Sequence, residues 1–457
     1  MPLALDRRAT VQLGLAALGA SFLTACGNRS PAQIDPAEPG SEIELISSDV
    51  RPAAGDPTLV PQVVAGLQAF SGRLYDALAR EHEGENLVLS PFSVLVALGM
   101  TLTGAAGRTA AEMREVLGAD DLGERWHAGL NALTRSLHGL AGEQERADGS
   151  SAEVALASAD QLFGQEGVAW EQEFVDLLAK EYGAPMRAVD FVGDTERARR
   201  LINDWVEAQT ADRITDLVPE GVLDVSTRLV LVNAIYLKAP WEEPFEKTLT
   251  TRGAFRRADG STVQADLMRR PDVGARLTSG RGWRAVTLPY AGRRLAMTVV
   301  LPDDTDDTDD TDDAGVGLAG VERRLADDGL AVFTPTEDGG ETTAVDLTLP
   351  RWTFRTAAPL REVLAGLGMP TAFTDAADFT PMTEEDLDLV VSEVLHQAFV
   401  AVDEEGTEAA AATAVVMTET SAPLTEAFVV DRPFLFVVHD VAHGTPLFVG
   451  RVTDPTA

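Results

Sequence analysis

The segment 404–422 constrains the fold more than any other part of the chain, because it has the flanks of a surface loop and the composition of a strand. It reads Glu-Glu-Gly-Thr-Glu, then four alanines at 409–412, then a stretch rich in β-branched residues before Pro423. Side chains alternate between the two faces of a strand, and one face would carry Thr407, Ala409, Ala411, Thr413, Val415 and Met417. The other face would carry Glu408 and then only small or β-branched residues. A segment suited to both states is a candidate for a moving part; an alanine-rich helical turn or a flexible loop is the alternative.

Short blocks elsewhere in the chain follow one another in a distinctive order and spacing. They are residues 86–93, 97–100, 104–109, 202–206, 231–236, 288–290, 402–411, 431–434 and 447–452. With these blocks the chain resembles the serpin family, serine protease inhibitors that insert their own reactive loop into a β-sheet. The resemblance runs from about residue 59 to residue 455, which is most of the chain.

The resemblance implies an α+β fold. Its centre is a large, mostly antiparallel β-sheet, called sheet A in the family, accompanied by two further sheets, about eight to nine helices and an exposed reactive loop. It also implies one large domain at 58–457, with the reactive loop at 404–425. A domain of about 400 residues is near the upper limit for one architecture, and 45% hydrophobic residues provide ample material for its core.

Apolar periodicity and charge locate several elements within this domain. Helical spacing predicts helices at 63–79, 93–102, 109–117, 173–182 and 195–210. The continuous apolar run 229–237 predicts a strand that is covered on both faces. Residues 303–313 repeat Asp-Asp-Thr, and like charges keep such a run extended, so we interpret it as an inserted surface loop. Calcium binding is the alternative, but the run lacks the glycine and the distal glutamate of a calcium loop.

The net charge of −36 limits the partners of the chain. A strongly acidic surface repels nucleic acid and anionic membranes. We therefore expect no nucleic-acid partner. Either the acidic residues form an ordinary solvated surface, or they steer a cationic protease toward the protein.

Cys26 is the only cysteine, so the chain can form no internal disulfide and no cysteine-based metal site. Arg7 and Arg8 precede an apolar run at 11–22 that follows the pattern of an export signal and is too short to span a membrane. The run ends in Leu-Thr-Ala-Cys. This ending resembles the lipobox of bacterial lipoproteins, which implies a lipid on Cys26.

These features predict three N-terminal parts: a signal peptide at 1–25, the lipidated Cys26 and a flexible tether at 26–57 that is rich in Ser, Pro, Gly and acids. We expect an exported protein that is lipid-anchored to the outer face of a bacterial cell membrane, or extracellular. An ordinary signal peptide with a chance cysteine is one alternative, and a twin-arginine signal is another.

Catalytic motifs do not support an enzyme. The chain has six histidines and no Gly-x-Ser-x-Gly elbow, no His-Glu-x-x-His, no P-loop and no Gly-x-Gly-x-x-Gly after a strand. We expect no enzyme activity, no cofactor, no metal site and no small-molecule substrate. An enzyme or a solute-binding lipoprotein is the alternative that the motif search disfavours.

The resemblance assigns roles to residues beneath the middle of the central sheet. Ser90, Pro91, Ser93, Asn233 and His396 match the family's shutter, which lies under the strands that part when the loop enters. Buried polar groups must pair. We therefore predict a hydrogen bond between Asn233 and His396 that holds the sheet closed; an ordinary core histidine is the alternative.

The resemblance also assigns residues to the breach, where the loop first enters the sheet. Trp241 matches the family tryptophan there, with a plain core aromatic as the alternative. Glu404 matches an acid at the end of the preceding strand, which the family pairs with a lysine near the breach. Lys238 lies just before Trp241 in the sequence, so we predict an ion pair between Glu404 and Lys238.

The hinge of the expected reactive loop meets the conditions for insertion, because it is small and carries no proline. The hinge residues are Glu404, Gly406, Thr407, Ala409, Ala410, Ala411 and Ala412. Inhibitory members of the family are suicide substrates: the protease cuts the loop, forms an acyl-enzyme and is trapped as the loop inserts. The resemblance therefore implies a monomeric inhibitor with a serine protease as its covalent partner. A non-inhibitory surface-binding protein of the same fold is the alternative.

Family spacing places the reactive bond between Thr420 and Ser421. A threonine before the bond suits an elastase-like or subtilisin-like protease with a small specificity pocket. Cleavage after Glu419 or Met417 is the alternative. A trypsin-like target is disfavoured, because no lysine or arginine occurs at 404–425.

Overall fold

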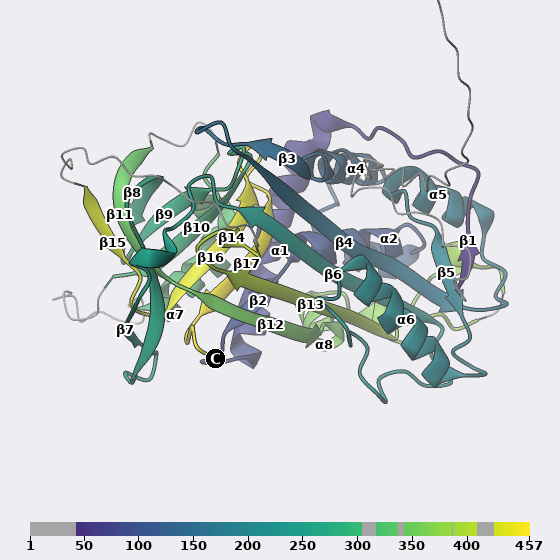
Figure 1. The fold of residues 1–457 in the computed structure, drawn as a ribbon. Coiled ribbons are helices and arrows are strands. Elements are labelled where there is room, and N and C mark those ends of the chain that lie inside the picture. The colour runs from purple at the N-terminus through teal and green to yellow at the C-terminus, as the bar shows by residue number, and fades with distance from the viewer. Residues whose placement is uncertain (1–42, 304–316, 337–341, 386, 409–424) are drawn as a thin grey trace, which may run out of the picture.

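The computed structural model describes residues 43–303, 317–336, 342–385, 387–408 and 425–457 (Figure 1). Several predicted features lie outside them: the signal peptide at 1–25, Cys26, most of the insert at 303–313, Ala409 to Ala412, and the bond between Thr420 and Ser421. These features stay predictions.

Eight strands of the described chain form the large central sheet that the resemblance implies. They are β1 (Glu44–Ile46), β3 (Gly142–Glu145), β4 (Ser151–Gln165), β5 (Met186–Val189), β6 (Leu229–Pro240), β12 (Trp352–Pro359), β13 (Glu393–Val402) and β14 (Gly406–Thr407). Their order is β1-β5-β4-β6-β14-β13-β12, and β3 pairs with β4 beside this path. The pairs β4–β5 and β6–β13 are parallel, and the other pairs are antiparallel. We call the end of this sheet that contains β14 its head, and the end where β6 begins its foot.

A second sheet combines the two further sheets that the resemblance implies. Its strands are β2 (Leu87–Leu89), β7 (Thr251–Arg256), β8 (Thr262–Gly280), β9 (Trp283–Pro289), β10 (Leu295–Pro302), β11 (Thr343–Pro350), β15 (Glu426–Val429), β16 (Phe434–Asp440) and β17 (Pro446–Val452). The long strand β8 joins the two halves, because it pairs with β11 along its first part and with β9 along its last part.

Helices pack around the two sheets (Figure 1). The α-helices of the described chain are α1 (Val60–Glu81), α2 (Pro91–Leu102), α3 (Gly107–Leu117), α4 (Arg125–His138), α5 (Gln172–Tyr182), α6 (Thr195–Gln209), α7 (Leu318–Asp328) and α8 (Arg361–Leu367). Short 3-10 helices are η1 (Pro57–Leu59), η2 (Lys247–Leu249), η4 (Leu330–Phe333), η5 (Pro370–Phe373) and η6 (Thr380–Met382). The predicted α+β fold is confirmed. Of the helices in the described ranges, none has both the length and the apolar composition that crossing a bilayer requires.

The two faces of β6 pack against different cores, which explains why its sequence is an unbroken apolar run. Leu231 and Ile235 belong to the large core that includes α1 and α2. Val230 and Val232 belong to a smaller core with residues of α6. All four side chains are fully buried. Odd-numbered residues of β6 therefore face α2 and even-numbered ones face α6, which confirms the prediction of a strand covered on both faces.

The tether predicted at 26–57 is wrong for its last part, because residues 43–57 belong to the folded body. Strand β1 pairs with β5 at the edge of the central sheet. Further along, Ala53 N–H donates to the Lys180 carbonyl at 2.7 Å and Asp56 N–H donates to the Ala128 carbonyl at 2.8 Å. Gly55 has φ +75°, and a Cβ there would lie 2.5 Å from the backbone nitrogen of Ala132. The composition of this stretch is that of a linker, but backbone hydrogen bonds hold it, and composition does not reveal these.

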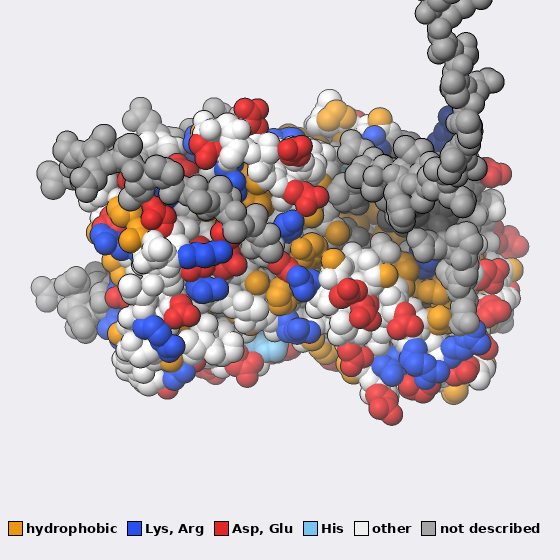
Figure 2. Space-filling view, viewed as in Figure 1, with side chains coloured by type: hydrophobic (Ala, Val, Ile, Leu, Met, Phe, Trp, Pro, Cys, Tyr) orange, Lys and Arg blue, Asp and Glu red, His pale blue; other side chains and the backbone are white. Residues whose placement is uncertain are grey.

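On the face that Figure 2 shows, the acidic residues of the described chain are spread over the surface. Figure 2 shows Asp and Glu side chains scattered across the visible face and interspersed with Lys and Arg, with no single acidic field on that face. For that face, this distribution fits the ordinary solvated surface better than a patch that steers a cationic partner.

Candidate functional site

A buried hydrogen-bonded cluster lies where β6 and β13 pair in the middle of the central sheet. Asn233 and His396 are opposite each other in the parallel register of these strands. His396 Nδ1 lies 2.5 Å from Asn233 Oδ1, and the Ser93 hydroxyl donates to the same oxygen at 2.9 Å. Ser90 N–H donates to His396 Nε2 at 3.1 Å. The structure thus brings together Ser90, Ser93, Asn233 and His396, and it places Pro91 beside them at the first position of α2.

These contacts determine the protonation of His396. Its Nε2 accepts a hydrogen bond from an amide, which can only donate, so the proton of the neutral ring sits on Nδ1 and is donated to Asn233. Burial lowers the pKa of His396 to about 3, which keeps the ring neutral. The predicted hydrogen bond between Asn233 and His396 is present.

The cluster has one further member that the sequence analysis missed. The amide of Asn233 donates to the carboxylate of Asp160 on β4, so the cluster extends across three strands. Asp160 is 9% exposed. The sequence signal that could have revealed Asp160 is its position as an acidic residue inside the long strand β4. A buried carboxylate without a partner would destabilise the fold.

At the head of the sheet, β14 has entered between β6 and β13. Gly406 pairs with Pro240, and Thr407 pairs with Ala239 on one side and Val402 on the other. Gly406 has φ +153°, and a Cβ there would lie 2.3 Å from the Ala239 carbonyl oxygen, so only glycine fits. Further toward the foot, β6 and β13 pair directly through six rows. The central sheet is therefore closed in its middle and holds Gly406 and Thr407 of the segment 404–422 at its head.

Trp241 fixes the backbone just before this entry point. Its indole N–H donates to the Asp403 carbonyl at 3.0 Å, and its backbone N–H donates to the Glu405 carbonyl at 2.8 Å. The indole stacks on Tyr290 with ring centroids 4.6 Å apart, and the Tyr290 hydroxyl shares a hydrogen bond of 2.6 Å with the Thr407 hydroxyl. Trp241 is therefore a core aromatic and also a residue that positions the backbone at Asp403 and Glu405.

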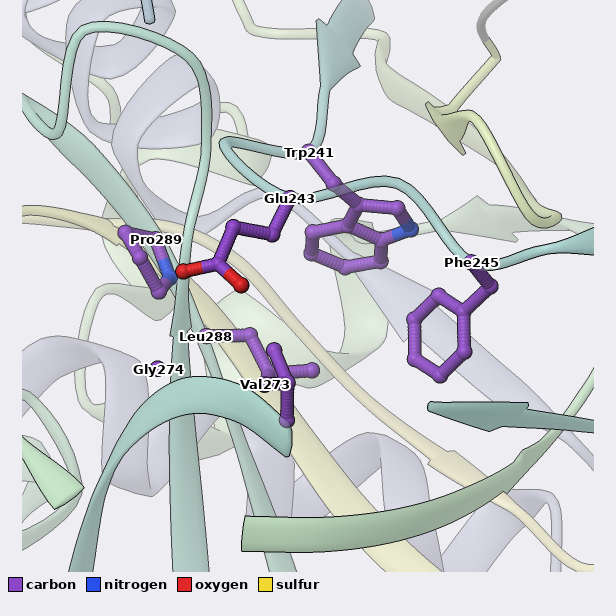
Figure 3. Close-up of a pocket in the computed structure, with 7 residues that line it drawn as sticks. All are labelled: Trp241, Glu243, Phe245, Val273, Gly274, Leu288 and Pro289. Carbon is purple, nitrogen blue, oxygen red and sulfur yellow. The ribbon is translucent and has the colours of Figure 1, made fainter. Parts of the chain in front are cut away.

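The crevice beside the Trp241 ring is too small for a ligand. Figure 3 shows the indole beside the ring of Phe245, with Glu243, Val273 and Leu288 around the same crevice. The crevice measures about 10 Å³, which is room for at most one water. It can serve packing but not the binding of a small molecule.

The predicted ion pair between Glu404 and Lys238 is wrong. Glu404 accepts a hydrogen bond of 2.6 Å from the Thr250 hydroxyl and lies 3.5 Å from the Arg351 guanidinium. Lys238 instead pairs with Glu153 at 3.1 Å. The reason lies in the backbone: Phe245 N–H donates to the Glu404 carbonyl at 2.8 Å, and the buried side chain of Glu404 then contacts Thr250 and Arg351.

Two further acids of the hinge have partners that sequence spacing could not reveal. Glu405 pairs with Lys247 at 3.1 Å, and Glu408 pairs with Arg213, which lies in the connection between α6 and β6. Glu408 has φ +48°, and burial raises its pKa. Asp403 accepts the backbone N–H of Glu405 at 2.8 Å and shapes the turn into β14. The hinge is thus held by contacts to several separate segments.

Two kinds of side-chain grouping are absent from the described residues. Over these residues no histidine hydrogen-bonds to a serine hydroxyl, and no three potential metal ligands cluster together. The site consists of two parts. At the head of the central sheet, β14 lies between β6 and β13. Nearer the foot, β6 and β13 pair directly, and the polar cluster around Asn233 and His396 joins them.

Comparison with known proteins identifies relatives of this chain. The family model described as "Serpin (serine protease inhibitor)" matches residues 65–455. A leukocyte elastase inhibitor of Sus scrofa is 35% identical over 396 residues, covering 86% of this chain and all of that protein. Serpin B4 of Homo sapiens is 36% identical over 383 residues, covering 82% and 95% of the two chains. The crystal structure of Serpin48, a highly specific serpin of the insect Tenebrio molitor, superimposes with a TM-score of 0.73 at 29% identity, covering 86% of this chain and 98% of that one.

Proposed function

The chain belongs to the serpin family of serine protease inhibitors, and we propose that it acts as a suicide substrate that traps a protease by inserting its cut loop between β6 and β13. The observation that carries the proposal is β14. Two residues of the segment already pair with both middle strands, and they run antiparallel to each of them.

The register of β14 predicts where the rest of the segment would go. If β14 continues toward the foot with one residue in each row of the sheet, Thr413 would lie between Asn233 and His396. Met417 would then lie beside Leu229 at the foot. The offset between β6 and β13 is the same at Thr407 and in the rows that pair directly, so one inserted strand fits both neighbours without a bulge. Thr420 would then reach the level of Ser226, just beyond the start of β6.

The side chains of the segment suit this path. The Thr407 hydroxyl bonds to buried Tyr290, so its face points to the large core, and the same face carries Ala409, Ala411, Thr413, Val415 and Met417. These residues would pack with the odd-numbered residues of β6. A hydroxyl at Thr413 can both donate and accept, so it could take up the polar groups freed when Asn233 and His396 separate.

The energy available is large enough to hold a protease. Insertion gives up the six direct rows between β6 and β13 and forms a ladder on each side of the new strand. A net gain of about a dozen hydrogen bonds at about 1 kcal/mol each amounts to on the order of 10 kcal/mol. This is comparable to the whole stability of a typical domain.

The reactive bond and the anchor complete the proposal. We place the bond at Thr420–Ser421, which favours a protease with a small specificity pocket, and the naming of one relative as a leukocyte elastase inhibitor supports an elastase-like or subtilisin-like target. We place the protein outside the cell, as a monomer joined to the membrane by a lipid on Cys26.

The test is to mix the chain with an elastase-like or subtilisin-like protease and to run a denaturing gel. We expect a covalent band at the summed mass, with the new N-terminus at Ser421. Thr407→Arg should be cut without forming that band, because Thr407 is 3% exposed and an arginine cannot enter there. Thr425→Arg, on the other side of the bond, is the matched control and should still form it. Cleavage of the unaltered chain without a covalent band would support the non-inhibitory alternative.

A further inference from the structure

We propose that a protease trapped by this chain comes to rest at the end of the molecule from which the N-terminal segment leaves. In a chain held on a membrane through Cys26, the trapped protease would then lie between the inhibitor body and the membrane. The inference rests on the proposed function and adds to it the place of the complex.

Sheet register locates the departure of the N-terminal segment. Glu44 pairs with Ala188, Ala188 pairs with Gly164, and Gly164 pairs with Leu229, so these residues form one row across β1, β5, β4 and β6. Leu229 is the first residue of β6, so this row lies at the foot of the sheet. Strand β1 runs from the foot toward the head, and the chain before Ile43 therefore leaves at the foot. Figure 1 shows β1 at the end of the molecule away from β14.

The same row receives the inserted loop. The register of β14 brings Met417 beside Leu229, and Thr420 ends three residues beyond it. With neighbouring strands about 4.8 Å apart, Glu44 and an inserted Met417 are separated by four strand spacings, or about 19 Å. The acyl bond to the protease and the start of the N-terminal segment thus share one end of the molecule.

The surface at this end is suited to receive a partner. Six large hydrophobic side chains of the described chain are exposed, and three of them, Val192, Val222 and Val225, lie in the turns that border the foot. Val192 follows β5, and the other two precede β6. Val225 is 64% exposed and directly precedes Ser226, the residue whose level Thr420 would reach.

The length of the segment from Cys26 to Ile43 decides whether a protease fits between the inhibitor body and the membrane. The segment from Cys26 to Ile43 reaches at most about 60 Å when fully extended, and as a flexible coil it spans about 23 Å. A protease of about 230 residues has a radius of gyration of about 17 Å, hence a diameter of roughly 45 Å. The full segment can admit a protease beneath the body, but a much shorter one could not.

The test uses the fact that Cys26 is the only thiol. The chain from Cys26 onward, the exported form proposed above, is coupled to maleimide lipid in phosphatidylcholine vesicles, and the ratio of covalent complex to cut chain is measured on a denaturing gel. A variant that lacks residues 30–40 keeps a reach of only about 20 Å. A second variant replaces these residues by a Gly-Ser linker of equal length. Each chain is also tested in solution with its thiol blocked.

We expect the shortened chain to form complex normally in solution and several-fold less on vesicles, where it is cut instead. The Gly-Ser chain should regain full complex formation on vesicles, because only reach matters. A shortened chain that traps equally well on vesicles and in solution would overturn the inference and leave the inhibitor proposal intact. If the full-length chain forms no covalent complex in solution, the proposed function fails, and the inference fails with it.

Discussion

At the scale of single residues, the neutral ring of His396 joins two strands and a helix. It donates to Asn233 on β6 and accepts from the Ser90 amide at the start of α2. A buried group that loses its partner costs more than the hydrogen bond gains when it forms. The closed sheet should therefore be sensitive to a single substitution at this point.

His396→Ala should destabilise the uncut protein by about 1–3 kcal/mol, because it leaves the Ser90 amide without a partner and removes one of the two donors to Asn233 Oδ1. It should also speed conversion to a loop-inserted or polymeric form, which native gels can follow over time. His439→Ala is the matched control: His439 is equally buried and bonds Thr298 in the second sheet. The His439→Ala variant should be less stable than the unaltered protein but should not convert faster to a loop-inserted or polymeric form. Equal conversion rates for both variants would remove the shutter role from His396.

Buried histidines also predict how stability depends on pH. Burial lowers the pKa of His396 to about 3 and those of His127 and His439 to about 4, against an ordinary value of 6.5. Between about pH 4 and 6.5 the unfolded chain takes up protons that the folded chain does not. Stability is therefore fully present above pH 6.5 and falls as the pH falls.

The loss should approach about 1.4 kcal/mol per pH unit for each histidine in that range. Urea unfolding at pH 7 and pH 5 measures it, and His396→Gln should show a shallower pH dependence than the unaltered chain. A free energy of unfolding that does not change between pH 7 and pH 5 would contradict the assignment of neutral buried rings.

At the scale of elements, β14 decides whether the loop starts inside or outside the sheet. Its entry depends on Gly406, on the Trp241 and Tyr290 pair, and on hinge acids held by Arg351, Lys247 and Arg213. The cationic partner in each of these ion pairs is 45–62% exposed, and ion pairs that solvent screens are individually weak. The close backbone approach at Gly406 is therefore the feature that a small change would disturb most.

Gly406→Ala should expel β14 from the head of the sheet, because its Cβ would collide with the Ala239 carbonyl and its φ would be strained. Hydrogen exchange at Thr407 and at the Trp241 amide should become faster, and the fluorescence of buried Trp241 should shift to longer wavelength. Gly366→Ala is the control, since nothing lies within 4 Å of its added Cβ. Unchanged exchange at Thr407 would show that β14 tolerates the side chain.

At the scale of the whole molecule, the proposed mechanism requires that the uncut chain does not form a strand ladder for which its loop has suitable residues. If cutting releases that ladder, the gain of on the order of 10 kcal/mol must appear in the stability of the cut protein. In that mechanism, the active form is not the most stable one.

Cleavage within 409–424 should raise the melting temperature by on the order of 10 °C or more. Circular dichroism of cut and uncut protein during heating measures the change. The variant Thr407→Arg supplies the control, because its cut loop should stay outside and its melting temperature should stay low. An unaltered melting temperature after cleavage of the unaltered chain would refute the stored-ladder mechanism.

The fold was predictable from the sequence where local pattern and family blocks agree. Helices such as α1 and α6 follow apolar spacing, and the fully buried β6 follows its unbroken apolar run. The site was predictable only in part. Asn233 and His396 meet as expected, but Asp160 on β4 was missed, because spacing along the chain does not say which third strand lies alongside.

The sequence by itself determined the family, the α+β class and the hydrogen bond between Asn233 and His396, because these depend on local composition and on blocks that each carry their own signal. Only the tertiary structure decided that Glu404 contacts Arg351 rather than Lys238, that residues 43–57 belong to the body, and that the N-terminal segment leaves at the foot of the sheet. The physical reason is the same in each case. Ion pairs and edge-strand pairing join residues far apart in the chain, and their geometry exists only once the backbone is folded.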